Sequence, residues 1–369
     1  MQVVTMASET AVSKDGLSLP LIDFSGYLHG DEQQKLAVSK AMLDGFRNAG
    51  FVYIKNYDIT DETVASIFAH SAKFFARPTD QKDKLAWTTP QANRGYAAPG
   101  REKTSRIEDA DKVAALIAES PDLKETFEIG REGVPGLPNN WPENLDADGA
   151  AFTDAMKGFF LTCRDLHMQV MRSIALGMGL DEAYFDGYTD GGDNNLRLLH
   201  YPAQHRSVFQ QGKNVVRTGR HTDYGSITLL FQDGKNGGLQ VKSPQGTFID
   251  APPIPGTIAF TLTYRANTKV INSGDLLARW ANDTIRSTEH QVVEPPHADD
   301  VETYPPRYSI AYFCNPNFDR FIEAIPGTFE EGKSAEEGGK KYPGINSGEY
   351  LVQRLAATFK GVPRYQTAY

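Results

Sequence analysis

Two side chains that can bind a metal, His221 and Asp223, stand two residues apart, directly before an apolar run over residues 226–231. In an extended chain the side chains at positions i and i+2 point to the same face. The imidazole and the carboxylate can therefore bind one ion together. A His-x-Asp pair is weak evidence by itself, so a metal site requires a further ligand elsewhere in the chain.

A second histidine, His290, lies in a short run of β-branched residues and can complete a facial triad with the first two ligands. Such a triad leaves three coordination positions open, as non-haem Fe(II) oxygenases require. A structural zinc site more often has four protein ligands, cysteines among them. An open iron site needs a reductant to activate O2, and a 2-oxo acid that chelates the metal can supply the electrons.

The far carboxylate of such an acid needs a cationic anchor, and Arg307 offers a planar fork for two hydrogen bonds. Ser309 lies on the same face of the strand expected over residues 307–314, as do Ala311 and Phe313. Taken singly, each of these residues is more often a surface or core residue. Their order along the chain, together with the triad, is what favours a binding site.

Composition limits the partners that this chain can bind. It has 369 residues, 40% of them hydrophobic, and a net charge of -9. The acidic balance argues against nucleic acid or an anionic membrane as a general partner. Two cysteines are too few for a disulfide framework, which favours a reducing, cytoplasmic location. We expect a small-molecule substrate, no nucleic-acid or membrane partner, no secretory signal, and a monomer.

Hydrophobic periodicity predicts helices in the first half of the chain and strands in the second. Helices are expected at residues 31–48, 61–76, 148–178 and 347–359, and early strands at 19–24, 51–56 and 124–130. Residues 87–103 are expected to form a loop that lines a site. Later strands are expected at residues 196–201, 226–231, 238–241, 247–249, 257–264, 290–293 and 307–314. In the strand at 196–201, Arg197 and Tyr201 share one face.

These elements predict a mainly β fold with flanking helices. We expect a flexible N-terminal tail (1–18), an α/β portion packed on the core (19–194), the β core itself (195–320) and a C-terminal helical tail (321–369).

The chain resembles the iron- and 2-oxoglutarate-dependent dioxygenases of the isopenicillin N synthase-like superfamily, and within it the fungal thymine dioxygenases. The resemblance covers nearly the whole chain. Besides the triad and the Arg-x-Ser pair, it rests on residues 20–24, 50–54, 87–103, 124–130, 196–202, 238–241 and 272–275. It implies a double-stranded β-helix, or jelly roll, with the iron at its mouth.

The resemblance also implies a role for each candidate residue. His221, Asp223 and His290 would bind Fe(II), with 2-oxoglutarate and O2 as cosubstrates. Arg307 and Ser309 would hold the C5 carboxylate of 2-oxoglutarate, assisted by Tyr201. For a thymine-like substrate, the expected contacts are the polar groups of Arg197 and Tyr224, the stacking face of Phe313 and a lid contact from Asn93.

One segment departs from the family pattern. Residues 258–269 look like an insertion of roughly a dozen residues, judged against typical loop lengths. It lies between the two halves of the triad, so it puts the placement of His290 and the substrate in question. Three alternatives stay open: a fungal secondary metabolite as the substrate, an oxidase that uses no 2-oxoglutarate, and a non-catalytic metal-binding relative disabled by the insertion.

Overall fold

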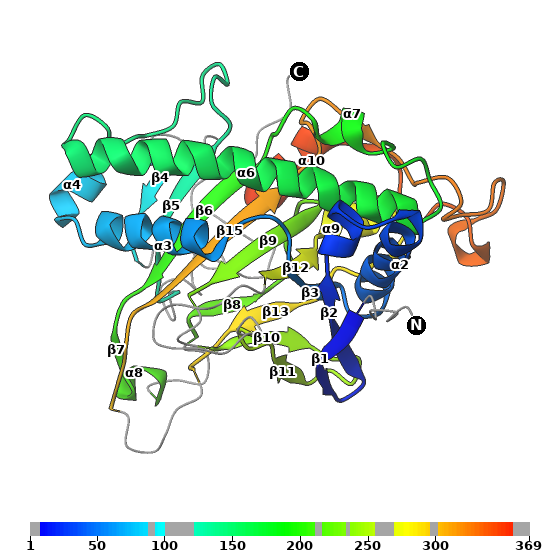
Figure 1. Cartoon of the computed structure of the whole chain (residues 1–369), viewed down its shortest axis with the longest axis horizontal. Coiled ribbons are helices and arrows are strands. Elements are labelled where there is room, and N and C mark those ends of the chain that lie inside the picture. Colours follow the sequence, from blue (N-terminus) through cyan, green and yellow to red (C-terminus); the bar gives the residue numbers. More distant parts are fainter. Residues whose placement is uncertain are drawn as a thin grey trace.

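Two β-sheets face each other, and helices cover the outer face of the larger sheet (Figure 1). This arrangement is seen in a computed structural model of the chain. The model describes residues 8–87, 93–99, 122–210, 216–233, 237–254, 269–295 and 302–356.

The major sheet has nine strands, and all neighbours run antiparallel except the parallel pair β2 and β3. In spatial order the strands are β1 (Ser8–Lys14), β2 (Leu17–Asp23), β3 (Phe51–Lys55), β12 (Lys269–Ser273), β9 (Ile227–Gln232), β15 (Arg307–Cys314), β6 (Asn195–Tyr201), β5 (Glu125–Gly130) and β4 (Gly95–Ala97). The central strands thus come from the second half of the chain, and segments of the first half extend the sheet at both edges.

The minor sheet is antiparallel and lies opposite the other face of the major sheet. Its strands are, in order, β11 (Phe248–Asp250), β10 (Leu239–Lys242), β13 (His290–Val292) and β8 (Thr218–His221). The two facing sheets form the predicted jelly roll. Two short antiparallel pairs complete the described strands: β7 (Gln204–His205) with β14 (Thr303–Tyr304), and β16 (Phe321–Ile322) with β17 (Ile345–Asn346).

The long helix α6 lies lengthwise across the major sheet, with α3 and α2 beside it (Figure 1). Side-chain caps fix where the helices start: Asp31 and Gln34 form a capping box at α2, and Thr60 and Asp146 cap α3 and α6. The helices are α1 (Ser25–Leu28), α2 (Glu32–Asn48), α3 (Asp61–Phe75), α4 (Thr79–Asp83), α6 (Ala147–Gly177), α7 (Asp186–Thr189), α8 (Ser207–Gln210), α9 (Asp275–Trp280), α10 (Ser347–Ala356) and the 3-10 turn η1 (Ala335–Glu337).

Strand alternation divides the interior into two apolar regions. Residues such as Phe231, Ile310 and Tyr312 point toward the helices and join the larger core there. A smaller core, with Leu21, Phe51 and members of β10 and β13, fills one end of the space between the sheets. The other end of that space remains open as a cavity. In the described part of the chain, no helix is long and apolar enough to cross a membrane.

The structure confirms most of the predicted elements and corrects two expectations. The prediction of a flexible N-terminal tail over residues 1–18 was wrong for the described residues 8–18, because β1 pairs with β2 and extends the major sheet. The strand ending before Asp275, which the apparent insertion put in doubt, is present as β12 between β3 and β9. Strands β1, β8 and the short strands β7, β14, β16 and β17 were not predicted, and β4 lies within the segment 87–103 that was expected to be a loop. The strand expected at 257–264 and all but the last residue of the segment 258–269 lie outside the described residues.

Candidate iron and cosubstrate site

Two adjacent strands of the minor sheet place the histidines next to each other. His221 ends β8 and His290 begins β13, and their Cα atoms are direct partners in the antiparallel ladder. The two imidazole centroids are 4.2 Å apart. Asp223 lies in residues 222–226, the segment between β8 and β9, which we call the metal-binding turn. The apparent insertion therefore does not prevent His290 from reaching the other two ligands.

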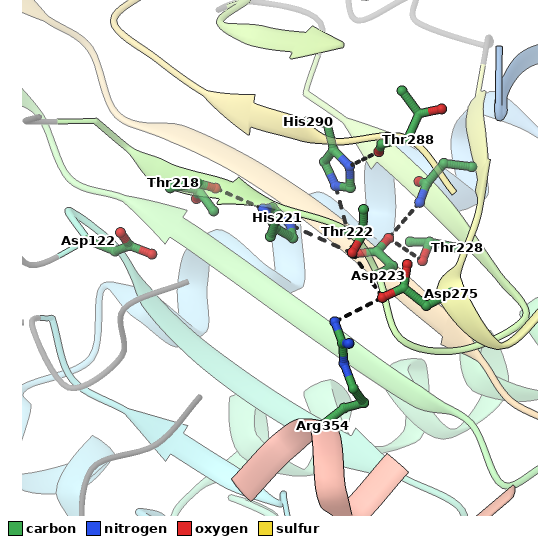
Figure 2. Close-up of polar contacts among 12 residues, drawn as sticks. Asp122, Thr218, His221, Thr222, Asp223, Thr228, Asp275, Thr288, His290 and Arg354 are labelled. Carbon is green, nitrogen blue, oxygen red and sulfur yellow. Dashed lines mark hydrogen bonds and ion pairs between the residues drawn. The ribbon is translucent and has the colours of Figure 1, made fainter. Parts of the chain in front are cut away.

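The three side chains converge on one point (Figure 2). Nε2 of His221 and Nε2 of His290 each lie 3.7 Å from Oδ1 of Asp223. One ligand atom from each residue lies within 4.8 Å of the others, a grouping that suits a metal ion. The side chains of His290 and Asp223 are only 9% and 6% exposed, so an ion bound there would meet solvent only from the cavity side.

Neighbouring groups orient each ligand toward this point. Nδ1 of His221 lies 2.8 Å from the carbonyl of Gly219, and Nδ1 of His290 lies 3.2 Å from that of Thr288. A carbonyl only accepts, so Nδ1 carries the proton and the Nε2 lone pair is free for a metal. Two further donors occupy Oδ2 of Asp223, each at 2.6 Å: the hydroxyl of Thr228 and the amide of Asn272. This leaves Oδ1 available.

The electrostatics keep His221 and Asp223 in the protonation states that bind a metal. Burial, reinforced by the neighbouring His290, lowers the pKa of His221 to about 3, so its imidazole is neutral. Burial by itself would raise the pKa of Asp223. The two histidines and the hydrogen bonds from Thr228 and Asn272 outweigh that effect and hold the pKa below its usual value. Asp223 is therefore a carboxylate.

Two glycines allow the metal-binding turn to pack closely against its neighbours. A Cβ on Gly225 would lie 2.3 Å from the carbonyl oxygen of Cys314, and one on Gly274 would lie 2.3 Å from that of Gly225. No larger residue fits at these contacts without moving backbone. The Asn-x-Gly-Asp turn that the sequence shares with the family is thus explained by packing against the turn that carries Asp223.

At one end of the cavity, Arg307 is almost fully buried at 1% exposure. Its Nη1 lies 3.2 Å from the Ser309 hydroxyl, and its Nη2 donates to Oε1 of Gln232, also at 3.2 Å. The guanidinium carbon is 5.0 Å from the centre of the Tyr201 ring, whose hydroxyl is 3.0 Å from that of Thr218. This cationic end fits the carboxylate of a dicarboxylic 2-oxo acid.

At the other end, Arg197 forms an ion pair with the fully buried Glu128, with 2.5 Å between Nε and Oε1. The two residues are Cα partners on β6 and β5. The guanidinium carbon of Arg197 lies 5.3 Å from the centre of the Phe313 ring. Glu128 neutralises the charge and fixes the fork, so Arg197 presents donors at a defined position without adding net charge.

Asn93 has a left-handed backbone (φ +45°), which asparagine tolerates better than most residues. Its carbonyl accepts a hydrogen bond of 3.2 Å from Nδ2 of Asn195. The side-chain oxygens Oδ1 of Asn93 and of Asn195 are both buried and have no hydrogen-bond partner among the residues that the structure describes. Both residues line this end of the cavity.

All ten residues singled out in the sequence line this one cavity. They are His221, Asp223, His290, Arg307, Ser309, Tyr201, Arg197, Tyr224, Phe313 and Asn93. Sequence reasoning did not single out several other lining residues, among them Lys124, Asn195, Asn272, Asn315 and Leu351. Lys124 is buried in an ion pair with Asp122 at 3.4 Å. The asparagines stand at strand ends, which was the one available signal.

Comparisons with known proteins agree with this site. A family model described as the 2OG-Fe(II) oxygenase superfamily matches residues 192–316, and one described as non-haem dioxygenase in morphine synthesis N-terminal matches residues 19–144. The 2-oxoglutarate-Fe(II) type oxidoreductase ppzD of Metarhizium rileyi is 33% identical, over 92% of this chain and 91% of its own. The proline hydroxylase buaE of Petromyces alliaceus is 32% identical, over 92% and 98%.

Two solved structures have a higher sequence identity to this chain than those relatives. The full-length thymine 7-hydroxylase of Neurospora crassa, in complex with alpha-KG and thymine, is 55% identical to this chain. The match covers 95% of this chain and 99% of that one, with a TM-score of 0.83. The complex of the same enzyme with alpha-KG and 5-formyluracil is similar at 53% identity and a TM-score of 0.82, over 95% and 99% of the two chains.

The fold and the open three-residue site define a non-haem iron oxygenase, and the chain belongs to the 2OG-Fe(II) oxygenase superfamily. It is a 2-oxoglutarate-dependent dioxygenase that uses Fe(II), 2-oxoglutarate and O2. Among solved structures it is similar over almost its whole length to the thymine 7-hydroxylase of Neurospora crassa.

Proposed function

We propose that this dioxygenase hydroxylates the methyl group of thymine or of a closely related pyrimidine. The observation that carries the proposal is the hydrogen-bonding pattern at the substrate end of the cavity. The similarity to the thymine complex of the Neurospora crassa enzyme supports it.

A pyrimidine-2,4-dione carries two ring N–H donors and two carbonyl acceptors. The cavity lining carries groups of both kinds: the side-chain amides of Asn93 and Asn195, and the donors of the Arg197 guanidinium. A site built for N–H and C=O groups rejects analogues that lack them, because its buried polar groups would then stay unpaired. This pattern favours a planar diamide over an aliphatic amino acid.

Aromatic faces suit a flat ring. Phe313 and Tyr224 both line the cavity, on β15 and directly after Asp223 respectively. We assign Phe313 to stacking and Tyr224 to a contact beside the metal. Offset stacking on an aromatic face adds about 0.5 to 1.5 kcal/mol beyond the burial of area. The methyl group of the ring would then point toward the triad.

His221, Asp223 and His290 would hold the iron, which when bound supplies the activation of O2 that an unactivated C–H bond requires. The reaction converts 2-oxoglutarate, O2 and the methyl group into succinate, CO2 and the alcohol. Arg307 and Ser309 hold the far carboxylate, so that the 2-oxo group lies toward the triad. The protein thus contributes position and exclusion of water rather than proton transfer.

The test is a screen for succinate release with Fe(II) and 2-oxoglutarate, using thymine, uracil, free proline and peptidyl proline. We expect thymine to stimulate release and to yield 5-hydroxymethyluracil, identified by mass spectrometry. Uracil tests whether the methyl group is the reacting group. Stimulation by proline substrates and none by thymine would contradict the proposal and favour a secondary-metabolite hydroxylase, as the relatives at about one third identity include.

A further inference from the structure

The C-terminal helix reaches the cavity from outside the two sheets. Leu351 of α10 lines the cavity, and Arg354 follows three residues later on the same side of the helix. Figure 2 shows the Arg354 side chain extending from its helix toward Asp275. A helix far from the ligands in sequence therefore touches the substrate end of the site.

The guanidinium of Arg354 contacts both Asp275 and Tyr224. Nη2 lies 2.9 Å from Oδ2 of Asp275, and the central carbon lies 4.8 Å from the centre of the Tyr224 ring. The side chains of Arg354 and Asp275 are 31% and 18% exposed, so the ion pair is partly shielded from water. Arginine can bind a carboxylate with its edge and stack on an aromatic ring with its face, which lysine cannot do in the same way.

Asp275 in turn is bonded to the metal-binding turn. The same Oδ2 accepts a hydrogen bond of 2.9 Å from the Thr222 hydroxyl. The backbone N–H of Asp275 donates to the carbonyl of Asp223 at 2.8 Å, and that of Leu276 donates to the carbonyl of Tyr224 at 3.1 Å. The helix is thus connected, through one carboxylate, to the turn that carries a metal ligand and a cavity-lining aromatic residue.

We propose that Arg354 is a positioning residue for the substrate. Together with Asp275 and Thr222 it forms a helix latch, which holds α10 against the metal-binding turn, fixes the ring of Tyr224 and keeps Leu351 in the cavity wall. The latch selects for a small planar substrate, because Leu351 narrows the cavity beside Tyr224. This inference rests on the proposed contact between Tyr224 and the substrate.

The latch is separate from the cosubstrate anchor. Arg307 and Ser309 belong to β15 of the major sheet, and none of the bonds described for the latch involves them. Loss of the latch should therefore weaken substrate binding and leave 2-oxoglutarate binding unchanged. General destabilisation would instead weaken both.

The experiment compares Arg354→Ala, Arg354→Lys and a control on the same helix, Gln353→Ala, whose side chain is exposed. We expect Arg354→Ala to raise the KM for thymine about tenfold, equivalent to ~1.4 kcal/mol. The KM for 2-oxoglutarate should stay within about twofold, as for distant independent sites. Arg354→Lys should restore part of the loss, and Gln353→Ala should match the unmodified protein.

A double-variant cycle tests whether Arg354 acts through Asp275. Asp275→Asn keeps an acceptor for Thr222 but removes the charge that pairs with Arg354. Adding Arg354→Ala to Asp275→Asn should therefore raise the KM for thymine by much less than tenfold. Full additivity of the two changes would overturn the coupling.

A substrate-free readout separates this inference from the proposed function. Amide hydrogen exchange should accelerate in residues 347–356 and 272–280 of the Arg354→Ala protein, measured without any pyrimidine. If the unmodified protein does not respond to thymine, the proposed function fails and the exchange result still decides the latch. Unchanged exchange in both segments, or equal losses for thymine and 2-oxoglutarate, would overturn the latch.

Discussion

The two faces of the major sheet use the same strands for opposite purposes. On β15, Arg307 and Ser309 point into the cavity, whereas Ile310 and Tyr312 point toward the helices. The cavity face carries polar side chains that can bind ligands. The helix face is mainly apolar, and the buried Lys269 at the start of β12 is among its polar exceptions.

The comparison shows how each face tolerates a buried cation. Arg307 on the cavity face has hydrogen bonds to Ser309 and Gln232, and a carboxylate ligand can complete its shell. Lys269 on the helix face has no hydrogen-bond partner for Nζ among the described residues, and the ring of Phe231 lies 4.4 Å from it. A binding site uses its buried charge, whereas the core is destabilised by one.

The largest effect is expected at the triad. Asp223→Ala removes one of three protein ligands, and turnover should fall by at least about a thousandfold, since loss of a supporting group around a metal already costs 10- to 100-fold. The measurement is succinate release under saturating 2-oxoglutarate and thymine. Circular dichroism should show an unchanged fold. Turnover within tenfold of the unmodified protein would remove Asp223 from the metal site.

The cosubstrate anchor is tested by Arg307→Ala, with Arg220→Ala as the matched control. Arg220 lies on β8 next to His221 but is exposed. We expect Arg307→Ala to weaken 2-oxoglutarate binding by about 2 to 5 kcal/mol, the cost of breaking a buried charge pair. Anaerobic titration of the iron-loaded protein with 2-oxoglutarate measures it. Equal affinities for the two variants would contradict the anchor.

The helix face is tested by Lys269→Met. Burial lowers the pKa of Lys269 to about 7, whereas an unfolded lysine titrates near 10.4. Between these pH values the unfolded chain binds the extra proton, so the unmodified protein loses stability as the pH falls from about 10.4 to about 7. Lys269→Met should therefore raise the free energy of unfolding at pH 7 by roughly 4 kcal/mol.

The difference in the free energy of unfolding between Lys269→Met and the unmodified protein should shrink toward zero as the pH rises to about 10. Denaturant unfolding at several pH values measures it, and the exposed Lys84 provides a control as Lys84→Met. A pH-independent difference between Lys269→Met and the unmodified protein would show that the ammonium is not destabilised by burial.

The smallest effect is expected at the substrate acceptors. Asn93→Ala removes one neutral hydrogen bond to the substrate. The KM for thymine should rise roughly fivefold, which corresponds to about 1 kcal/mol of binding free energy. Asn93→Asp keeps an acceptor and should lose less. An unchanged KM in Asn93→Ala would show that the ring N–H groups of the substrate bind other residues of the cavity.

Strand alternation is the reason that much of this site could be predicted from the sequence. The two-residue period placed Arg307, Ser309 and Phe313 on one face. The chemistry of an open iron site singled out His290 as a third ligand, and the family resemblance supported it. What stayed hidden depends on pairing across the sheet. Glu128 becomes the partner of Arg197 only through the register of β5 with β6.

Two further features could not be read from the sequence for the same physical reason. Strand β8 has the sequence TGRH, with too few apolar residues to show a pattern, and it is stabilised by its ladder with β13. Arg354 looks like an ordinary helix-surface residue. Its role depends on the place where α10 packs, which long-range contacts determine.

If the proposed function is right, oxidation of 2-oxoglutarate in this cavity is coupled to hydroxylation of the thymine methyl group. The direct test is turnover under ¹⁸O2, with succinate and 5-hydroxymethyluracil measured together by mass spectrometry. We expect equal amounts of the two products in the first turnover, with one labelled oxygen in each. Succinate release that thymine does not stimulate, or an alcohol without label, would contradict it.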